Sequence, residues 1–327
     1  MKRTAIGISL VVAVLTLGSF IAGEGQQPMT GNPPPLSNPL KVALLKWYGA
    51  NTVPTTFAVG NQPYGVAFDG ANVWVANFAD NTVSKVRVTD GAVLGTFPAG
   101  GFEPYGVTFD GANVWVSNLD SGTVTKLRAS DGKLLTTVTV GANPGWMAFD
   151  GANLWVPYGN NTVAKIQAGT GAITGSFTVG VSPIATACDG VNIWVVNGGG
   201  NGTGSVTKLR ARDGKVMGTF SVGVSPIGVA FDGASIWVAN YGEGTVSKLR
   251  ASDGTLLGTF NTPGSPYGLA FDGANVWVTG SPYVYELRAS DGSQVGFFVP
   301  HTNTVGVAFD GANVWIAQQN TNALGKM

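Results

Sequence analysis

One line of sequence recurs through this chain at nearly even spacing. "VAFDGANVWVAN", residues 66–77, returns as "VTFDGANVWVSN" at residues 107–118 and as "VAFDGASIWVAN" at residues 229–240. Each copy places a tryptophan five residues after an aspartate, and successive aspartates are 41, 40, 39, 43, 40 and 38 residues apart. The seven pairs are Asp69–Trp74, Asp110–Trp115, Asp150–Trp155, Asp189–Trp194, Asp232–Trp237, Asp272–Trp277 and Asp310–Trp315. A period of about 40 residues is typical of repeat architectures in which each copy is one structural unit.

Each copy divides into four short strands. In the first copy the segments "YGVAF", "VWVAN", "TVSKVRV" and "VLGTFPAG" are rich in β-branched and aromatic residues, which favour strands. Asp-Gly and Asn separate them, because glycine accepts a positive φ and aspartate caps its own turn. Seven repeats of four strands predict an all-β, seven-bladed β-propeller with four antiparallel strands per blade. The repeated tryptophan is expected to fill the space between neighbouring blades.

The two ends of the repeat region predict how the ring closes. Residues 52–60, "TVPTTFAVG", resemble the fourth strand but precede the first full copy. The last copy ends within its third strand, where Lys326 stands in the place of Lys85. An N-terminal strand that completes the last blade would close the ring and cover its open edges.

Composition excludes several classes of protein. Charged residues make up 11% of the chain and the net charge is zero, so the chain lacks the excess of positive charge that is typical of nucleic-acid-binding proteins. Cys188 is the only cysteine, which excludes a disulfide within the chain and a cysteine-based metal site, and we expect it to be a small buried hydrophobe. No P-loop, nucleophile elbow or metal-ligand spacing is present, and we expect neither a cofactor nor a bound metal.

The first 50 residues predict export. Residues 1–23 read as a signal peptide, in which Lys2 and Arg3 precede an apolar run that ends in small residues. We therefore expect a monomeric bacterial protein that is secreted or periplasmic, and attached to the membrane only if the signal is uncleaved. A proline-rich linker is expected over residues 24–38, a short helix over 39–50 and the propeller over 52–327.

The loops on the two faces of the predicted ring differ in how much their sequences vary between copies. The turns after strands one and three, "DGAN" and "SDG", repeat almost unchanged, whereas the loops after strand two change from "FADN" to "LDSG", "YGNN" and "NGGGNGTGS". Varied loops on a rigid frame are where binding and catalytic residues gather. We therefore interpret the repeated line as scaffold and expect function on the variable face.

Aromatic side chains enter this variable face near the predicted axis. The candidates for ligand binding are Tyr64, Tyr105, Trp146 and Tyr267, in the loops that enter strand one. Rings around a funnel suit sugars, peptides or small apolar ligands, but they would equally form a packed plug over the channel. The ends of strand two add Asn77, Asn118, Asn197 and Asn240, which would either line the funnel or satisfy loop backbone.

Acid–base candidates are few. His301 is the only histidine, and it lies with Glu103 in loops that enter strand one. These two residues could transfer a proton if they met over the funnel, whereas a solvated lone histidine would have no such role. The repeated lysine and arginine of strand three, such as Lys85 and Arg87, are expected to pair with turn aspartates such as Asp90.

The run "PYGVAFDGANVWVANFADNTVSKVRVTDG" resembles bacterial propeller repeats of the YVTN and NHL kind, which include streptogramin B lyase-like and YncE-like propellers. The resemblance covers residues 52–327 and implies a seven-bladed propeller, in a group that mixes enzymes with binding and scaffold proteins. Streptogramin lyases use histidine and glutamate with magnesium, and their histidine follows a proline in the loop that enters strand one. Here Tyr64, Tyr105 and Tyr267 occupy the matching places, after Pro63, Pro104 and Pro266, and His301 lies nearby but outside that context. This departure argues against lyase chemistry.

Gluconolactonase-like propellers, which this chain also resembles, bind a divalent metal at the axis through Glu, Asp and Asn. Only four glutamates are present, and at most two of them reach the variable face. We therefore expect a secreted, non-catalytic propeller that binds a small molecule, a saccharide or a protein on that face. The alternatives are a lyase- or lactonase-type enzyme with its site at the central funnel, and a scaffold tethered through its N-terminal segment.

Overall fold

The computed structural model describes residues 55–327, except for residues 160, 200–201 and 301. The predicted signal peptide, linker and short helix all lie outside the described residues, as does His301. Among the described residues, no helix is both long enough and apolar enough to span a membrane.

Seven four-stranded sheets follow one another along the chain, and we number them as blades one to seven. Blade one contains β2 (Pro63–Phe68), β3 (Asn72–Asn77), β4 (Thr82–Arg87) and β5 (Val93–Pro98). Blade two contains β6 (Pro104–Phe109), β7 (Asn113–Asn118), β8 (Thr123–Arg128) and β9 (Leu134–Thr139). Blade three contains β10 (Ala148–Phe149), β11 (Asn153–Tyr158), β12 (Thr162–Gln167) and β13 (Ile173–Thr178). Blade four contains β14 (Pro183–Cys188), β15 (Asn192–Asn197), β16 (Thr203–Arg210) and β17 (Val216–Val224).

The remaining blades repeat this order. Blade five contains β18 (Pro226–Phe231), β19 (Ser235–Asn240), β20 (Thr245–Arg250) and β21 (Leu256–Asn261). Blade six contains β22 (Ser265–Phe271), β23 (Asn275–Ser281), β24 (Val284–Arg288) and β25 (Gln294–Phe298). Blade seven contains β26 (Thr304–Phe309), β27 (Val314–Gln318), the 3₁₀ turn η1 (Gln319–Thr321), β28 (Ala323–Lys326) and β1 (Thr55–Ala58).

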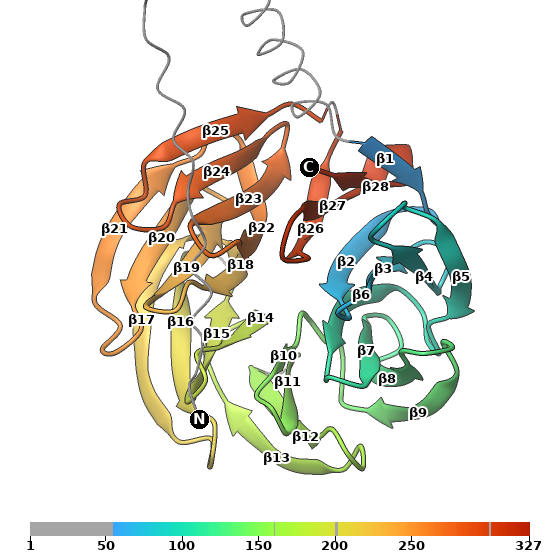
Figure 1. Ribbon diagram of the computed structural model, residues 1–327. Coiled ribbons are helices and arrows are strands. Elements are labelled where there is room, and N and C mark those ends of the chain that lie inside the picture. The colour runs from blue at the N-terminus through green and yellow to red at the C-terminus, as the bar shows by residue number, and fades with distance from the viewer. Residues whose placement is uncertain (1–54, 160, 200–201, 301) are drawn as a thin grey trace, which may run out of the picture. The chain divides into compact units, whose positions relative to one another are not determined.

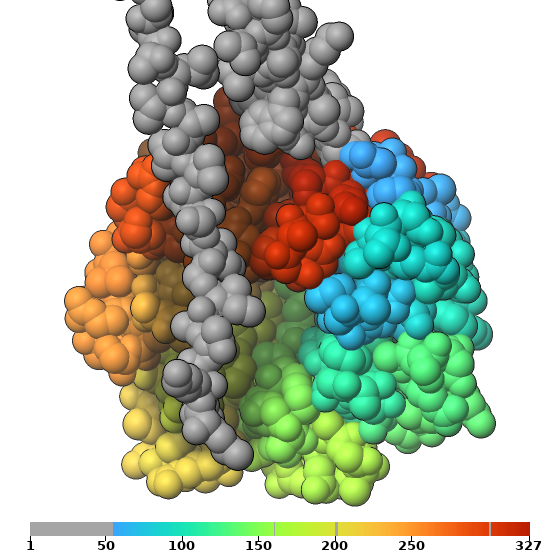
Figure 2. All heavy atoms as spheres, in the orientation of Figure 1, coloured from blue at the N-terminus to red at the C-terminus, as the bar shows by residue number. Residues whose placement is uncertain are grey.

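The seven blades form a ring around a central axis, with the first strand of each blade innermost (Figure 1). All strand pairs within the blades are antiparallel, which confirms the predicted fold class. In the space-filling view the blades pack against their neighbours as separate lobes (Figure 2). The strand order β1-β28-β27-β26 confirms the predicted closure, because the N-terminal strand β1 lies beside β28 as the outer strand of blade seven.

The repeated line folds the same way in every blade. In blade one, Asp69 Oδ1 accepts the backbone N–H groups of Ala71 and Asn72, and Gly70 takes a φ of +97° in the turn. Asp69 Oδ2 accepts the indole N–H of Trp74 at 2.7 Å. The same aspartate–tryptophan bond is present in all seven blades. One carboxylate therefore caps the turn and orients the large ring of the next strand.

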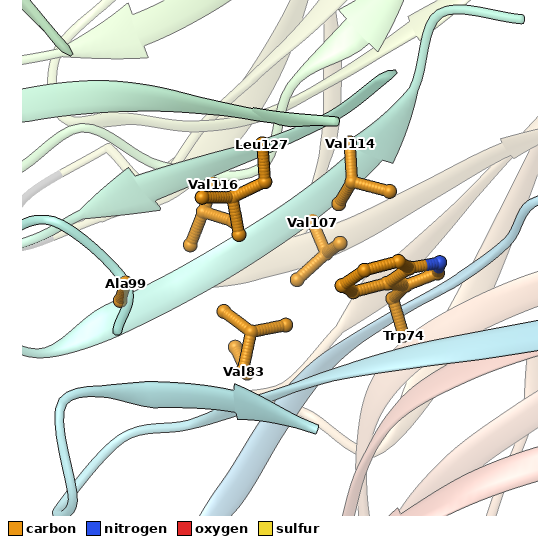
Figure 3. Packing of buried hydrophobic residues seen from close by; sticks show 8 residues of the cluster. Trp74, Val83, Ala99, Val107, Val114, Val116 and Leu127 are labelled. Carbon is orange, nitrogen blue, oxygen red and sulfur yellow. The ribbon is translucent and has the colours of Figure 1, made fainter. Parts of the chain in front are cut away.

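The hydrophobic core lies between blades, as predicted from the tryptophans. Trp74 of β3 packs with Val107 of β6, Val116 of β7 and Leu127 of β8, so that blade one rests on blade two (Figure 3). The six tryptophans equivalent to Trp74 in blades two, three, four, five, six and seven have the same place in their strands, and all but Trp277 are fully buried. Burial of such rings supplies most of the apolar contact between blades.

In six of the seven blades, a lysine of the third strand contacts the next blade. Lys85 Nζ lies 5.2 Å from the centroid of the Trp74 ring and donates to the carbonyl oxygen of Ala129 at 2.7 Å, in blade two. Five more lysines make the equivalent contacts, namely Lys126, Lys165, Lys208, Lys248 and Lys326.

The predicted charge pairing at the rim is therefore correct for the arginines and for one lysine. Arg87 contacts Asp90 at 2.9 Å, and four other arginines contact the aspartate three residues later in the same way. Among the lysines, Lys126 Nζ lies 4.0 Å from the turn aspartate Asp110, whereas the prediction is wrong for Lys85. Lys85 is only 8% exposed, and its ammonium group bonds to backbone of the following blade.

Candidate functional site

The four predicted aromatic side chains come together on the variable face. The rings of Tyr105 and Trp146 are stacked, with centroids 5.2 Å apart and an interplanar angle of 12°. Tyr64 lies 5.1 Å from Tyr105, and Tyr267 meets Trp146 edge-on at 5.4 Å. Blades one, two, three and six thus contribute one ring each to a single aromatic cluster.

Two phenols of this cluster are hydrogen-bonded to each other. The hydroxyl groups of Tyr105 and Tyr267 lie 2.9 Å apart, although the residues are 162 positions apart in the chain. Burial raises the pKa of Tyr105 to about 12 and raises the pKa of Tyr267 as well. Both phenols are therefore protonated at neutral pH. Because their shared bond uses only one of the two protons, the other O–H remains a free donor.

A Pro-Tyr-Gly sequence explains how the tyrosines reach the axis. The pairing between β2 and β3 shifts register between Pro63 and Val66, and a bulge of this kind re-aims a side chain. The glycine after the tyrosine is required by the neighbouring blade, because a Cβ on Gly65 would lie 2.4 Å from the carbonyl oxygen of Tyr105. The same shift and the same crowding occur around Tyr267.

A pocket of about 470 Å³ opens above these rings. Three of its lining residues are Tyr64, Tyr105 and Tyr267, and apolar walls come from Phe78, Leu119, Pro183 and Ile184. Its polar lining residues are Asn143, Asn161 and Ser182. None of the lining residues that the structure describes carries a charge, and we call this site the aromatic pocket.

A separate channel of about 180 Å³ follows the axis, lined by first-strand residues of the blades together with Trp146. Trp146 faces this channel, whereas the three tyrosines face the aromatic pocket. The aromatic cluster therefore lies between channel and pocket. Its rings pack against one another as a plug would, and they also present a surface to the pocket.

The predicted asparagines do not line the pocket. Asn77, Asn118, Asn197 and Asn240 are all 0% exposed. The side-chain amide of Asn77 donates to Thr82 and Ser84 of the next strand, and its Oδ1 accepts the N–H of Gly60. Equivalent amide bonds hold the other three in their own blades. Asn77 and Asn240 thus satisfy loop backbone, the alternative that the sequence left open, whereas the amides of Asn118 and Asn197 donate to hydroxyl groups of the third strand.

Of the two acid–base candidates, only Glu103 lies among the described residues. Glu103 adopts a φ of +56°, and its backbone N–H donates to Asn81 Oδ1 at 2.8 Å. Its carboxylate has no hydrogen bond or ion pair with any described residue, and His301 lies outside that part of the chain. Within the described residues, no group of three or more His, Cys, Asp or Glu side chains could hold a metal ion.

Sequence reasoning missed several residues of the site. Phe78 lies 4.9 Å from Tyr64, and Tyr241 meets Tyr267 edge-on at 6.0 Å. Both residues directly follow the strand-two asparagine, as Leu119 does in blade two. A comparison of this one position across the copies would have found them, because it changes from Phe to Leu to Tyr while the asparagine before it repeats.

The fold is shared with solved structures of low sequence similarity. Hydrazine synthase of Kuenenia stuttgartiensis is 18% identical, with a TM-score of 0.71 over 83% of this chain and 96% of that one. A streptogramin B lyase is 16% identical, with a TM-score of 0.69 and the same coverage. This chain shares the propeller fold of both structures.

A third structure is a catalytically inactive virginiamycin B lyase from Staphylococcus aureus with quinupristin. It is 18% identical, with a TM-score of 0.70 over 83% of this chain and 97% of that one. No protein-family model matches the chain, and no curated protein matches its sequence. Because these identities are low, the structural neighbours establish the propeller fold and leave the activity of this protein open.

Proposed function

We propose that this protein is an exported, non-catalytic binding propeller whose aromatic pocket takes an uncharged ligand. The observation that carries the proposal is the pocket itself, in which three tyrosines and four apolar side chains meet and no described lining residue is charged. Its volume falls within the range of about 300–1,000 Å³ that is typical of ligand sites. Small molecules, saccharides and protein segments all belong to the class of ligand it could take.

The protonated state of the phenols argues against a role for them as general bases. Tyr105 and Tyr267 keep their protons at neutral pH because burial raises the pKa of both. A protonated phenol donates a hydrogen bond to a ligand but cannot accept a proton from it, and a general base must do so. Export is supported by the sequence of residues 1–23.

A ligand that binds only the folded protein must raise its unfolding temperature. We expect at least one uncharged compound from a panel of neutral saccharides, capped peptides and lactones to do so. The shift should disappear in Tyr64→Ala, which removes a pocket ring. It should persist in Phe102→Ala, which removes a ring that is 61% exposed and does not line the pocket. A panel without any shift, or a shift that survives in Tyr64→Ala, would refute the proposal.

The alternative is a lyase- or lactonase-type enzyme, which the fold of the streptogramin B lyase favours. Incubation with a streptogramin B or a lactone, followed by mass spectrometry of the products, tests it directly. Turnover that is lost in His301→Ala or Glu103→Gln would replace the binding proposal. We expect unchanged substrate in every sample.

A further inference from the structure

We propose that the outer edge of blade six is an interface through which two copies of this chain associate. Its outer strand β25, at the rim of the ring (Figure 1), pairs antiparallel with β25 of the second copy, so that two four-stranded sheets join into one. The inference stands apart from the proposed function, because none of the residues that carry it lines the aromatic pocket.

One face of the outer strand is apolar in blade six and polar in the other blades. Val295, Phe297 and Val299 are 48%, 57% and 39% exposed, and they alternate with the half-buried Gly296 and Phe298. Alternate residues of a strand point to the same side of the sheet, so the three exposed side chains share one face. At the position of Phe297, the outer strands of the other six blades have a hydroxyl residue, namely Thr56, Thr96, Thr137, Ser176, Thr219 or Thr259.

The neighbouring strand continues this apolar face. Tyr285 of β24 pairs with Phe297 of β25, and the ring of Tyr283 meets the ring of Phe297 edge-on, with centroids 5.9 Å apart. The rings of Tyr283 and Tyr285 are also 5.9 Å apart, and Tyr285 is buried beneath them. We call the exposed side chains Tyr283, Val295, Phe297 and Val299 the edge patch. Exposed apolar patches of this kind are typical of protein–protein interaction sites.

The backbone of β25 is open to pairing. β25 is the last strand of its sheet, in the order β22-β23-β24-β25, and no strand among the described residues covers its outer side. Natural proteins usually protect such an edge with lysine, with other charged residues or with proline. The sequence of β25, "QVGFF", contains none of these. Its outward N–H and C=O groups can therefore bond to a further strand.

The order of residues in β25 favours a second copy as that further strand. Gly296 lies midway between Val295 and Phe297, so antiparallel pairing with Gly296 opposite Gly296 places each Val295 opposite Phe297 of the other copy. Directly opposite side chains lie on the same face with Cβ atoms about 4.5–5.5 Å apart, and pairs of aromatic and β-branched residues stabilise sheets. The two exposed side chains of each copy thus cover those of the other.

Symmetry and charge agree with this arrangement. Because the two copies use the same surface, the contact closes as a two-fold dimer and does not continue into a filament. The net charge of the chain is zero, so no net repulsion opposes the approach of a second copy. The equivalent register in blade one places Leu94 opposite Thr96, an apolar residue against a hydroxyl, which explains why blade six is the blade that pairs.

The edge patch is smaller than the contact surface of a permanent dimer, to which each partner contributes about 20–30 residues. We therefore expect a weak association, with a dissociation constant of about 10–100 µM. The monomer that the sequence predicts is then the main form at lower concentrations.

The test is sedimentation equilibrium of the full-length protein between about 1 and 300 µM, since mass action makes a dimer depend on concentration. We expect the average molar mass to rise from that of one chain toward that of two. Phe297→Thr introduces the residue that blades one and two carry at this position, so the fold should tolerate it. It should raise the dissociation constant at least about tenfold, because it removes a buried ring from both copies.

Leu135→Thr is the matched control. Leu135 holds the position of Val295 in blade two and is 40% exposed, and blade three has Thr174 there. This variant should associate as the wild type does. Unfolding temperatures of both variants show that each is folded before the molar masses are compared.

Hydrogen exchange separates strand pairing from contact between side chains alone. The N–H groups of β25 that point away from β24 become hydrogen-bonded in the dimer, so exchange in β25 should slow as the concentration rises. Exchange in β9, the outer strand of blade two, should stay the same. A protein that remains monomeric up to the highest concentration, equal weakening in Leu135→Thr, or association without slower exchange in β25 would overturn the inference.

Discussion

At the scale of single residues, blade six departs from the other blades at the position over the tryptophan ring. Six blades carry a lysine over the tryptophan ring, but blade six carries Glu286. Glu286 accepts the side-chain amide of Asn275 at 2.8 Å. Burial, and then the nearby charge of Asp272, raise the pKa of Glu286 above its ordinary value of 4.5. Blade six thus has a carboxylate where the other blades have a cation.

The raised pKa of Glu286 predicts that removal of its charge stabilises the protein, and that this gain depends on pH. A carboxyl whose folded pKa is raised contributes stability below its unfolded pKa, and that contribution is lost as the pH rises through the folded pKa. Glu286→Gln should therefore raise the unfolding temperature at pH 7 by about 1–3 °C. The gain should disappear as the pH falls below about 4.5, the ordinary pKa of the group. Calorimetric scans between pH 3.5 and 7 measure both effects.

Glu103→Gln is the matched control, since its carboxylate has no partner among the described residues and should leave the unfolding temperature unchanged. A gain in Glu286→Gln that is the same at every pH would show that charge is not its cause.

At the scale of elements, the outer strand of each blade depends on a pair of residues two apart. Phe97 of β5 packs on Trp74, with ring centroids 5.6 Å apart. The Phe97 ring lies over Gly95, where an added Cβ would lie 2.6 Å from Phe97 Cζ. In blade two the corresponding residues are Thr136 and Val138, a smaller side chain that leaves room for a β-branched neighbour. The size of the second residue thus decides what the first can be.

This pairing predicts strong coupling between the two positions. Gly95→Thr alone should destabilise the protein by about 1–3 kcal/mol, because the new side chain must displace the Phe97 ring. Added to Phe97→Val, the same change should cost much less, because the double variant reproduces the pair in blade two. Chemical denaturation of both single variants and the double variant gives the coupling energy.

Gly169→Ala controls for the loss of a glycine, because a Cβ there would meet nothing within 4 Å. It should change the free energy of unfolding by less than about 0.5 kcal/mol. Strict additivity of Gly95→Thr and Phe97→Val would contradict the steric explanation.

At the scale of the whole molecule, the ring is closed by four residues. Thr55, Thr56, Phe57 and Ala58 of β1 pair with β28, and Phe57 lies 5.7 Å from Trp315, in the place that Phe97 has in blade one. Phe57 also covers Gly91 of blade one, where a Cβ would lie 1.8 Å from the Phe57 ring. One side chain therefore joins the closing strand both to its own blade and to the next.

Phe57→Ala should open the ring locally as well as destabilise it. We expect a loss of about 3 kcal/mol in the free energy of unfolding. Hydrogen exchange should accelerate in β1 and β28 before the rest of the ring, because β1 is held by few other contacts. In the matched variant Phe97→Ala, the outer strand is continuous with its blade, so exchange should stay uniform. Equal, global exchange in both variants would show that the closure is no weaker than any other blade.

Local patterns in the sequence determined the blade. The Asp-Gly turns, the strand residues and the interval of about 40 residues specify four antiparallel strands, and their sevenfold recurrence predicts the ring and its closing strand. The aromatic residues of the site could also be predicted, because Tyr64, Tyr105, Trp146 and Tyr267 occupy one equivalent position per copy. These features depend on residues that are close together in the sequence, so each repeat contains them by itself.

Only the tertiary structure decided how the copies meet. The bond between Tyr105 and Tyr267 joins blades two and six, and its existence depends on the diameter of the closed ring. The contact of Lys85 with Ala129 and the complete burial of Asn77 likewise depend on how closely the strands approach. No single repeat contains these distances. They arise when seven blades pack around one axis, and the chemistry of the aromatic pocket arises with them.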